Sequence, residues 1–142
     1  MYLRLVREGA AFTIYALEMG DTLHQFLAEL EKNDLREHDR ILARLDQLAE
    51  RGASRRKDEF NDLGDGLYEA KTSAGCRVVF FYEQNQIIIC TNGFIKKSRK
   101  TPRQLLKVAK EHKRAYKEYR QARKPVQRII ISATQEKPRR MP

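Results

Sequence analysis

Four charged residues near the middle of the chain, Glu69, Lys71, Arg77 and Lys97, are of the types that metal-free cleavage of RNA requires. A carboxylate such as Glu69 can take the proton from a 2′-hydroxyl group as the general base. Cations such as Lys71 and Arg77 can hold the phosphate and stabilise the charge that develops on its oxygens. Lys97, or Lys96 beside it, could add a second positive charge or, with a lowered pKa, serve as the general acid.

These side chains can act together only if the backbone brings them to one part of a sheet. Residues 67–73, 76–83 and 87–94 have strand-like composition and are separated by short turns, which predicts an antiparallel meander. Alternate residues of a strand share a face, so Glu69 and Lys71 point the same way. The arginine opens the second strand, and the two lysines follow the third. A simpler interpretation stays open, in which the glutamate and the first lysine form an ordinary surface ion pair.

Helices and one further extended segment surround the predicted meander. Residues 1–19 alternate in the manner of one strand or of a hairpin of two. A helical hairpin with one apolar stripe follows, begun by a capping box from Thr22 to Gln25 and closed by Gly52. Residues 53–66, rich in charged residues, Asn and Gly, are expected to form a loop.

A basic helix is the last regular element that the sequence predicts. Thr101 is its expected N-cap, Pro102 occupies the first helical position, and Gln104 completes a capping box. The helix is expected to run to about Arg123, where Lys-Pro stops it. The order of elements is then β-αα-βββ-α, which places the chain in the α+β fold class.

The length of 142 residues fits one domain, which we expect over residues 1–124. Residues 125–142 read as a C-terminal extension that is partly disordered, in which Ile129–Ile131 could be an added edge strand or a partner-binding segment. No apolar run is long enough to span a bilayer and the first residues are charged, so a cytoplasmic protein without membrane contact is expected. Cys76 and Cys90 lie too far apart along the predicted ladder for a disulfide, which predicts free thiols.

The positive charge is concentrated in one stretch. The chain carries a net charge of +10, yet residues 1–95 hold more acidic than basic side chains. Residues 96–124 hold 13 Lys and Arg against Glu111 and Glu118 alone. A block of one sign repels itself, and a polyanion relieves the repulsion, with nucleic acid the first candidate and anionic lipid the second. The alternative is a solvated cationic helix without a partner.

Several segments, taken together, resemble the RelE/HigB superfamily of bacterial toxins in its phage-derived, HigB-like branch. They are Leu63-Gly64-Asp65-Gly66-Leu67-Tyr68-Glu69, the apolar strand Arg77–Tyr82, and Gly93-Phe94-Ile95-Lys96-Lys97-Ser98-Arg99-Lys100-Thr101-Pro102. The likeness covers about residues 12–118. It implies a RelE-like fold, with a small curved, mainly antiparallel sheet flanked by an N-terminal helical hairpin and a basic C-terminal helix. It also implies a ribosome-dependent mRNA endonuclease, the toxin of a type II toxin–antitoxin pair, whose partners are mRNA, the ribosome and a helix-turn-helix antitoxin.

The resemblance maps family active-site positions onto Glu69, Lys71 and Arg77, and Lys97 stands beside them as a candidate. Many members add a C-terminal Tyr or His, which this chain lacks at the matching place, so the general acid stays open. Neither a cofactor nor a metal is implied. The residues expected to bind RNA or the ribosome are Phe94, Lys96, Arg99, Lys100, Arg103, Lys107, Lys110 and Arg114.

Two other functions remain open from the sequence, a non-catalytic nucleic-acid-binding protein and a relative whose nuclease site has decayed. The histidines do not decide between them. His24 and His38 are expected at the surface or its boundary, and His112 is expected to be a solvated residue of the basic helix. Tyr116 and Tyr119 on that helix are not expected to reach the site.

Overall fold

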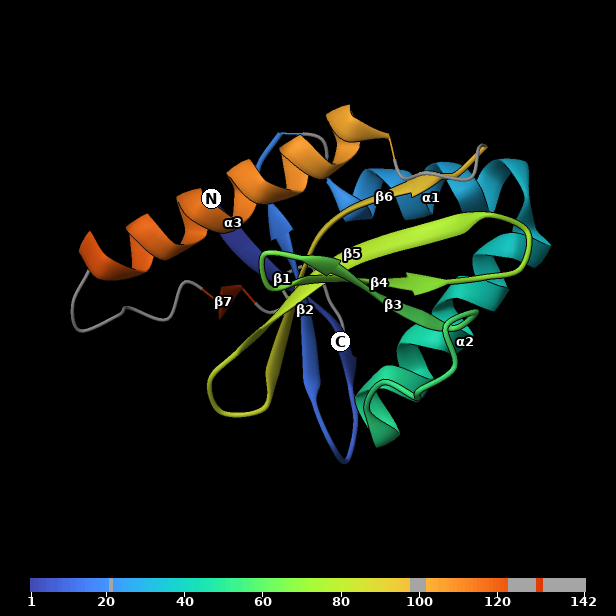
Figure 1. Ribbon diagram of the computed structural model, residues 1–142, viewed down its shortest axis with the longest axis horizontal. Helices are drawn as coiled ribbons and strands as arrows, with labels where there is room; N and C mark the ends of the chain where they lie inside the picture. The colour runs from blue at the N-terminus through green and yellow to red at the C-terminus, as the bar shows by residue number, and fades with distance from the viewer. Residues whose placement is uncertain (21, 98–101, 123–129, 132–142) are drawn as a thin grey trace.

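A single mixed sheet, with helices on both faces, forms the centre of the molecule. The computed structural model describes residues 1–20, 22–97, 102–122 and 130–131. The strand order is β3-β4-β5-β6-β2-β1-β7. Helices α1 (Leu23–Asn33) and α2 (Leu35–Arg51) cover one face, and α3 (Arg103–Ala122) crosses the other (Figure 1). The α+β class is therefore confirmed.

The N-terminal segment forms a hairpin of two strands, and not the single strand that the sequence also allowed. Strand β1 (Tyr2–Glu8) pairs antiparallel with β2 (Thr13–Glu18), and β2 pairs in parallel with β6. The turn docks on the end of α2, where the Ala49 carbonyl accepts bonds from the amides of Ala11 and Phe12, both at 2.9 Å. The hairpin thus ties the sheet to the helical layer.

Two helices, α1 and α2, form in this segment with the caps that the sequence predicts. The Thr22 hydroxyl accepts from the Gln25 amide at 3.1 Å, and the Gln25 side chain accepts from the Thr22 amide, so the capping box is complete. Asp34 ends α1 and also caps α2, where its carboxylate accepts from the Glu37 amide at 3.2 Å. Gly52 ends α2 with a positive φ of 83°.

The meander is present, and the structure adds one strand before it. Strands β4 (Leu67–Lys71), β5 (Cys76–Glu83) and β6 (Ile87–Ile95) are antiparallel neighbours, as predicted. The prediction of a loop over residues 53–66 is wrong for its second half, because β3 (Phe60–Gly64) pairs antiparallel with β4. This strand carries Asn, Asp and Gly and lies at the sheet edge, so its pairing rather than its composition makes it extended.

Alternation along the strands divides the apolar residues into two cores. Ile14, Ala16, Val78 and Phe80 belong to the cluster that α1 and α2 complete. Their neighbours in sequence face the other way and pack against Ala109 and Tyr116 of α3. These neighbours are Leu17, Val79 and Phe81. Because helices cover both faces, β5 is buried along nearly its whole length, which accounts for its continuous apolar run.

The basic helix begins at Arg103 and ends at Ala122, close to the predicted limits. The predicted N-cap Thr101 lies outside the described residues. Strand β7 (Ile130–Ile131) pairs in parallel with β1, so this part of the tail adds an edge strand. The remaining expectations for residues 125–142 also fall outside the described part of the chain.

Cys76 and Cys90 are free and buried, as predicted. An irregularity between Val79 and Phe80 shifts the register, so Cys76 lies opposite Ile95 rather than residue 93 or 94. Burial raises the pKa of each thiol to about 12. None of the described helices combines the length and apolar composition that crossing a bilayer requires.

We predict that Gly9→Ala destabilises the protein by about 1–3 kcal/mol, the usual cost of overpacking. An added Cβ would collide with the backbone of Ala49, which the N-terminal turn needs as its hydrogen-bond acceptor. Chemical denaturation compared with Ala10→Ser, a change at an exposed neighbour, measures the effect. Equal stability of the two variants would show that the turn does not depend on this close approach.

Candidate functional site

One face of the meander gathers the charged residues that the sequence singled out. Lys71 lies directly opposite Arg77 on the antiparallel β4–β5 pair, and Arg77 lies opposite Phe94 of β6. In the next row, Asn61 of β3 lies opposite Glu69. Residues directly opposite each other have Cβ atoms about 4.5–5.5 Å apart. The pairing therefore places Glu69, Lys71 and Arg77 within one small area.

Glu69 and Arg77 form an enclosed ion pair. Glu69 is 1% exposed and Arg77 is 9% exposed, and the Arg77 Nε lies 3.8 Å from the Glu69 Oε1. The other carboxylate oxygen accepts a long bond of 3.4 Å from the Asn61 amide. Neither Oε1 of the glutamate nor Nε of the arginine has a hydrogen-bond partner among the described residues. Buried polar groups are normally hydrogen-bonded, so these two atoms call for a further partner, such as water or a ligand.

Backbone groups at the β4–β5 turn hold the guanidinium of Arg77. Its Nη1 donates to the carbonyls of Thr72 and Cys76 at 3.0 and 2.9 Å. The same turn binds the end of β6, because the Gly75 carbonyl accepts from the Lys96 amide at 2.7 Å. Lys96 therefore leaves β6 beside the turn that holds the arginine.

Lys71 is the partly exposed cation of this cluster. Its Nζ donates to the carbonyl of Lys57 at 2.7 Å. Burial lowers the pKa of Lys71, the positive charges of Arg77 and Lys96 lower it further, and the negative charge of Glu69 opposes them. A lysine with a lowered pKa gives up its proton more readily than an ordinary surface lysine. The environment thus makes Lys71 a better proton donor while leaving its ammonium within reach of a ligand.

The predicted residues differ in how accessible they are. Lys97, two residues after the end of β6, is exposed. Arg99 and Lys100 lie outside the described residues. Glu69 is enclosed, so in this arrangement its carboxylate acts on Arg77 and not directly on a ligand. Phe94 is 6% exposed and packs in the core beneath α3, which makes it a packing residue rather than a surface on which a base could stack.

Acidic residues of the β3–β4 turn, of β5 and of α3 itself partly neutralise the basic helix. Lys110 pairs with Asp65 at 3.0 Å and Arg114 with Glu118 at 3.5 Å. Lys117 and Arg120 both pair with Glu83 of β5, at 3.5 and 3.3 Å. Arg103 and Lys107 are exposed and have no ion pair with any described residue. The pairs of Lys110 and Arg114 are exposed on both sides and therefore weak, so a polyanion can replace their acidic partners at little cost.

His112 is buried, so the prediction of a solvated histidine is wrong. It is 6% exposed and its Nδ1 has no hydrogen-bond partner within the described chain. The reason is its phase on α3, where it lies on the same side as Ala109 and Tyr116, which pack on the sheet. Tyr116 contacts Phe81, and burial raises its pKa to about 12. His24 and His38 lie at the surface or its boundary, as predicted.

Several residues that support the site gave little signal in the sequence. Asn61 reaches Glu69 only because β3 pairs with β4. Thr72 accepts from Arg77 with its carbonyl, and its hydroxyl donates to the buried carboxylate of Glu37 in α2. The sequence shows that Glu37 is charged but not that it is buried, because its partner Thr72 is 35 residues away.

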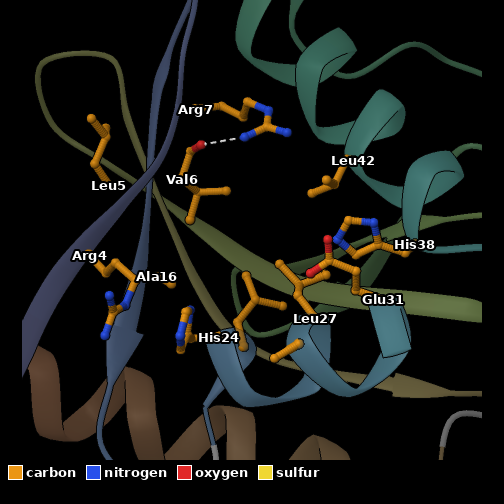
Figure 2. A pocket seen from close by; sticks show the side chains of 12 residues that line it. Arg4, Leu5, Val6, Arg7, Ala16, His24, Leu27, Glu31, His38 and Leu42 are labelled. Carbon is orange, nitrogen blue, oxygen red and sulfur yellow. Dashed lines mark hydrogen bonds between the residues drawn. The ribbon is translucent and has the colours of Figure 1, made fainter. Parts of the chain in front are cut away.

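A separate cavity of about 250 Å³ lies on the opposite face of the sheet. Side chains from β1, α1 and α2 line it, among them Val6, Leu27, Glu31 and His38 (Figure 2). Its floor residues Ala16 and Leu23 belong to the core that α1 and α2 complete. The cavity is therefore distinct from the Glu69–Arg77 pair. Within the described residues, no group of three or more His, Cys, Asp or Glu side chains is placed to hold a metal ion.

We predict strong energetic coupling between Glu69 and Arg77. Removing one member of a buried pair leaves the other charge uncompensated, so Glu69→Gln and Arg77→Met should each cost about 3–5 kcal/mol. The double variant should lose less than the sum, because neither charge is then left alone. Denaturation of the four proteins gives the coupling energy. Additive losses would mean that the two side chains do not interact in solution.

Comparison with known families agrees with the likeness seen in the sequence. The family model described as Phage derived protein Gp49-like (DUF891) matches residues 26–114, more than half of the chain. The matched span runs from α1 through the meander into α3 and so contains the Glu69–Arg77 pair. No curated protein matches the chain at a significant level. The chain therefore belongs to the Gp49-like family of phage-derived proteins, a RelE/HigB-like toxin family of toxin–antitoxin systems.

Proposed function

We propose that this protein is a toxin of the HigB-like branch with a RelE-like fold, and that it cleaves mRNA on translating ribosomes without a metal ion. The convergence of Lys71 and Arg77 on one hairpin end carries the proposal. There Lys71, a partly exposed lysine with a lowered pKa, lies opposite Arg77 in the strand pairing, and the Arg77 Nε has no hydrogen-bond partner among the described residues. Two adjacent cations on a rigid hairpin suit a phosphodiester, whose charge grows during cleavage. The family supports a toxin role and, with it, an antitoxin partner.

In the proposed reaction the 2′-oxygen attacks the phosphorus as its proton passes to a base, and the bond to the 5′-oxygen breaks. The 5′-oxygen takes a proton from the general acid, leaving a 2′,3′-cyclic phosphate and a 5′-hydroxyl. Arg77 and Lys71 hold the phosphate, and Lys71 is our choice for the acid, with Lys97 as a second electrostatic group. Glu69 can serve as the base only when the bound phosphate draws Arg77 away from it, because its carboxylate is otherwise enclosed.

The proposed RNA and ribosome contacts lie around the hairpin end and along α3. Lys96, Arg103 and Lys107 offer charges with no ion pair to a described residue. Lys110 and Arg114 can exchange their acidic partners for phosphates. Arg99 and Lys100 belong to the same proposed surface by their place in the sequence. Such an enzyme would act in the cytoplasm, held inactive by a helix-turn-helix antitoxin.

A second candidate is a protein that binds nucleic acid without cutting it, including a relative whose nuclease site has decayed. The enclosure of Glu69 favours this alternative, because a general base must reach the proton that it removes. Binding by the cations of α3 would survive in such a protein and would weaken steeply with salt.

We predict that the protein cleaves mRNA in a purified translation system and that Arg77→Ala lowers the cleavage rate by about 10²–10³-fold. A loss of this size follows when a group that stabilises the developing charge is removed. Mapping of RNA ends should find cyclic phosphates, and EDTA treatment of the purified protein should leave its activity unchanged.

Arg51→Ala is the matched control, since Arg51 is an exposed arginine in the last turn of α2, on the other face of the sheet. It should cleave like the unmodified protein. Salt-sensitive binding to RNA without any cut ends would reject the nuclease and favour the second candidate. Cleavage that survives in Arg77→Ala would reject the assigned site.

A further inference from the structure

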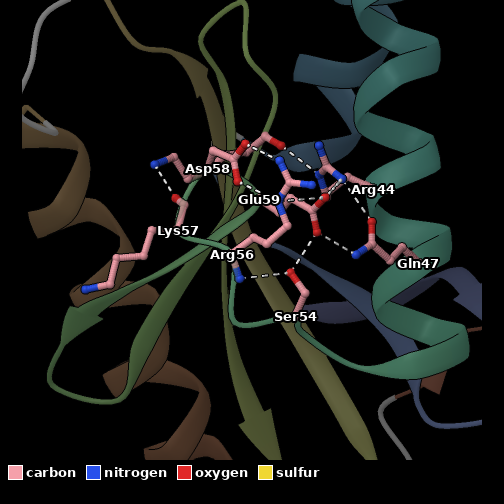
Figure 3. Close-up of polar contacts among 8 residues, drawn as sticks. Arg44, Gln47, Ser54, Arg56, Lys57, Asp58 and Glu59 are labelled. Carbon is pink, nitrogen blue, oxygen red and sulfur yellow. Dashed lines mark hydrogen bonds and ion pairs between the residues drawn. The ribbon is translucent and has the colours of Figure 1, made fainter.

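The segment between α2 and β3 is tied down by one carboxylate. The Glu59 side chain accepts hydrogen bonds from Gln47 Nε2 at 2.8 Å and from Ser54 Oγ at 2.7 Å (Figure 3). Arg44 of α2 approaches the same carboxylate at 3.4 Å. These contacts fasten residues 54–59 to the helix. Hydrogen bonds from Ser54 and Gln47, together with the charges of Arg44 and Arg56, lower the pKa of Glu59.

The fastened segment binds Lys71 at two of its atoms, and Arg44 of α2 binds it at a third. The Lys71 amide donates to the Glu59 carbonyl at 2.8 Å. The Lys71 carbonyl accepts from the Arg44 Nε at 2.8 Å. The Lys71 Nζ donates to the Lys57 carbonyl at 2.7 Å. Lys71 is the last residue of β4, so without these contacts only one neighbouring strand would restrain it.

We propose that Glu59 is a positioning residue for Lys71: by binding the 54–59 segment to α2, it keeps the Lys57 carbonyl beneath the ammonium and holds that ammonium beside Arg77. The catalytic meaning of this arrangement rests on the proposed function. The positioning itself does not, because it concerns only where the ammonium lies.

The number of hydrogen bonds available to the ammonium supports this assignment. An ammonium has three donors, and the Lys57 carbonyl engages one of them, so two remain for phosphate oxygens. A lysine side chain is otherwise flexible and strongly hydrated, and it would turn toward water. The bond to the Lys57 carbonyl therefore fixes the direction of Nζ while leaving it able to bind.

The charges around the ammonium give the inference a measurable consequence. Burial, Arg77 and Lys96 lower the pKa of Lys71, whereas Glu69 and Asp58 raise it. Release of the segment would let the ammonium move away from Arg77 into water. The pKa of Lys71 would then rise toward its ordinary value. Loss of the Asp58 charge alone would lower the pKa of Lys71.

The test is an NMR titration of the Lys71 ammonium in the full chain, without RNA, for Glu59→Ala and for Asp58→Asn as the matched control. Asp58 is adjacent and also pairs with Arg56, but among the described residues its carboxylate forms no hydrogen bond or ion pair with Gln47, Ser54 or Arg44. We expect the pKa of Lys71 to rise in Glu59→Ala and to stay level or fall in Asp58→Asn. Ser54→Ala removes a single hydrogen bond to Glu59 and should give a smaller rise in the pKa of Lys71. It replaces Glu59→Ala as the test variant if Glu59→Ala does not fold.

Two results would overturn the positioning role. One is an unchanged pKa of Lys71 in folded Glu59→Ala and Ser54→Ala, and the other is an equal rise in Asp58→Asn. In the cleavage assay, Glu59→Ala should lower kcat on the order of 10–100-fold with KM unchanged, since displacing a reacting group costs rate rather than binding. If the unmodified protein cleaves nothing, the proposed function fails, while the titration still decides whether Glu59 positions Lys71.

Discussion

Burial of the Glu69–Arg77 pair is the constraint on which the site depends. Charges taken out of water must be compensated, and here the compensation comes from several elements. The carboxylate receives Asn61 from β3, and the guanidinium receives two carbonyls from the β4–β5 turn. The contact between the two side chains is nonetheless long, at 3.8 Å, and one atom of each finds no hydrogen-bond partner in the described part of the chain. The surroundings therefore hold the pair in place without completing its bonding.

The helical layer on the far face of the sheet supports the same hairpin end. Arg44 binds the backbone of Lys71, and Glu37 binds the hydroxyl of Thr72, whose carbonyl in turn holds Arg77. Helix α2 thus restrains β4 and its turn through buried or partly buried polar contacts, while α3 covers the opposite face. A site fixed from both faces can hold like charges close together, as Lys71 and Arg77 show.

Part of the positive charge of the basic helix is paired with carboxylates of the same chain, which its sequence does not suggest. Its net charge predicts a cationic surface, yet Asp65 in the β3–β4 turn pairs with Lys110, and Glu83 of β5 pairs with Lys117 and Arg120. Only the pair of Lys110 with Asp65 is exposed on both sides and contributes little to stability, while the pairs with Glu83 are partly buried. They do lower the self-repulsion of the helix while the protein is unbound. A polyanion would displace the carboxylate from Lys110 and would meet Arg103 and Lys107, which have no ion pair to a described residue.

The sequence by itself determined the meander, the two N-terminal helices and the basic helix, because caps, turns and periodicity act within a few residues. It also determined that Glu69 and Lys71 share a face. It did not reveal strand β3, since a polar edge segment becomes a strand only when a neighbour pairs with it. Nor could it show that Glu69 and His112 are buried, or that Glu59 and Arg44 hold Lys71. Burial and long-range hydrogen bonds depend on which elements pack together, and only the tertiary structure decides that.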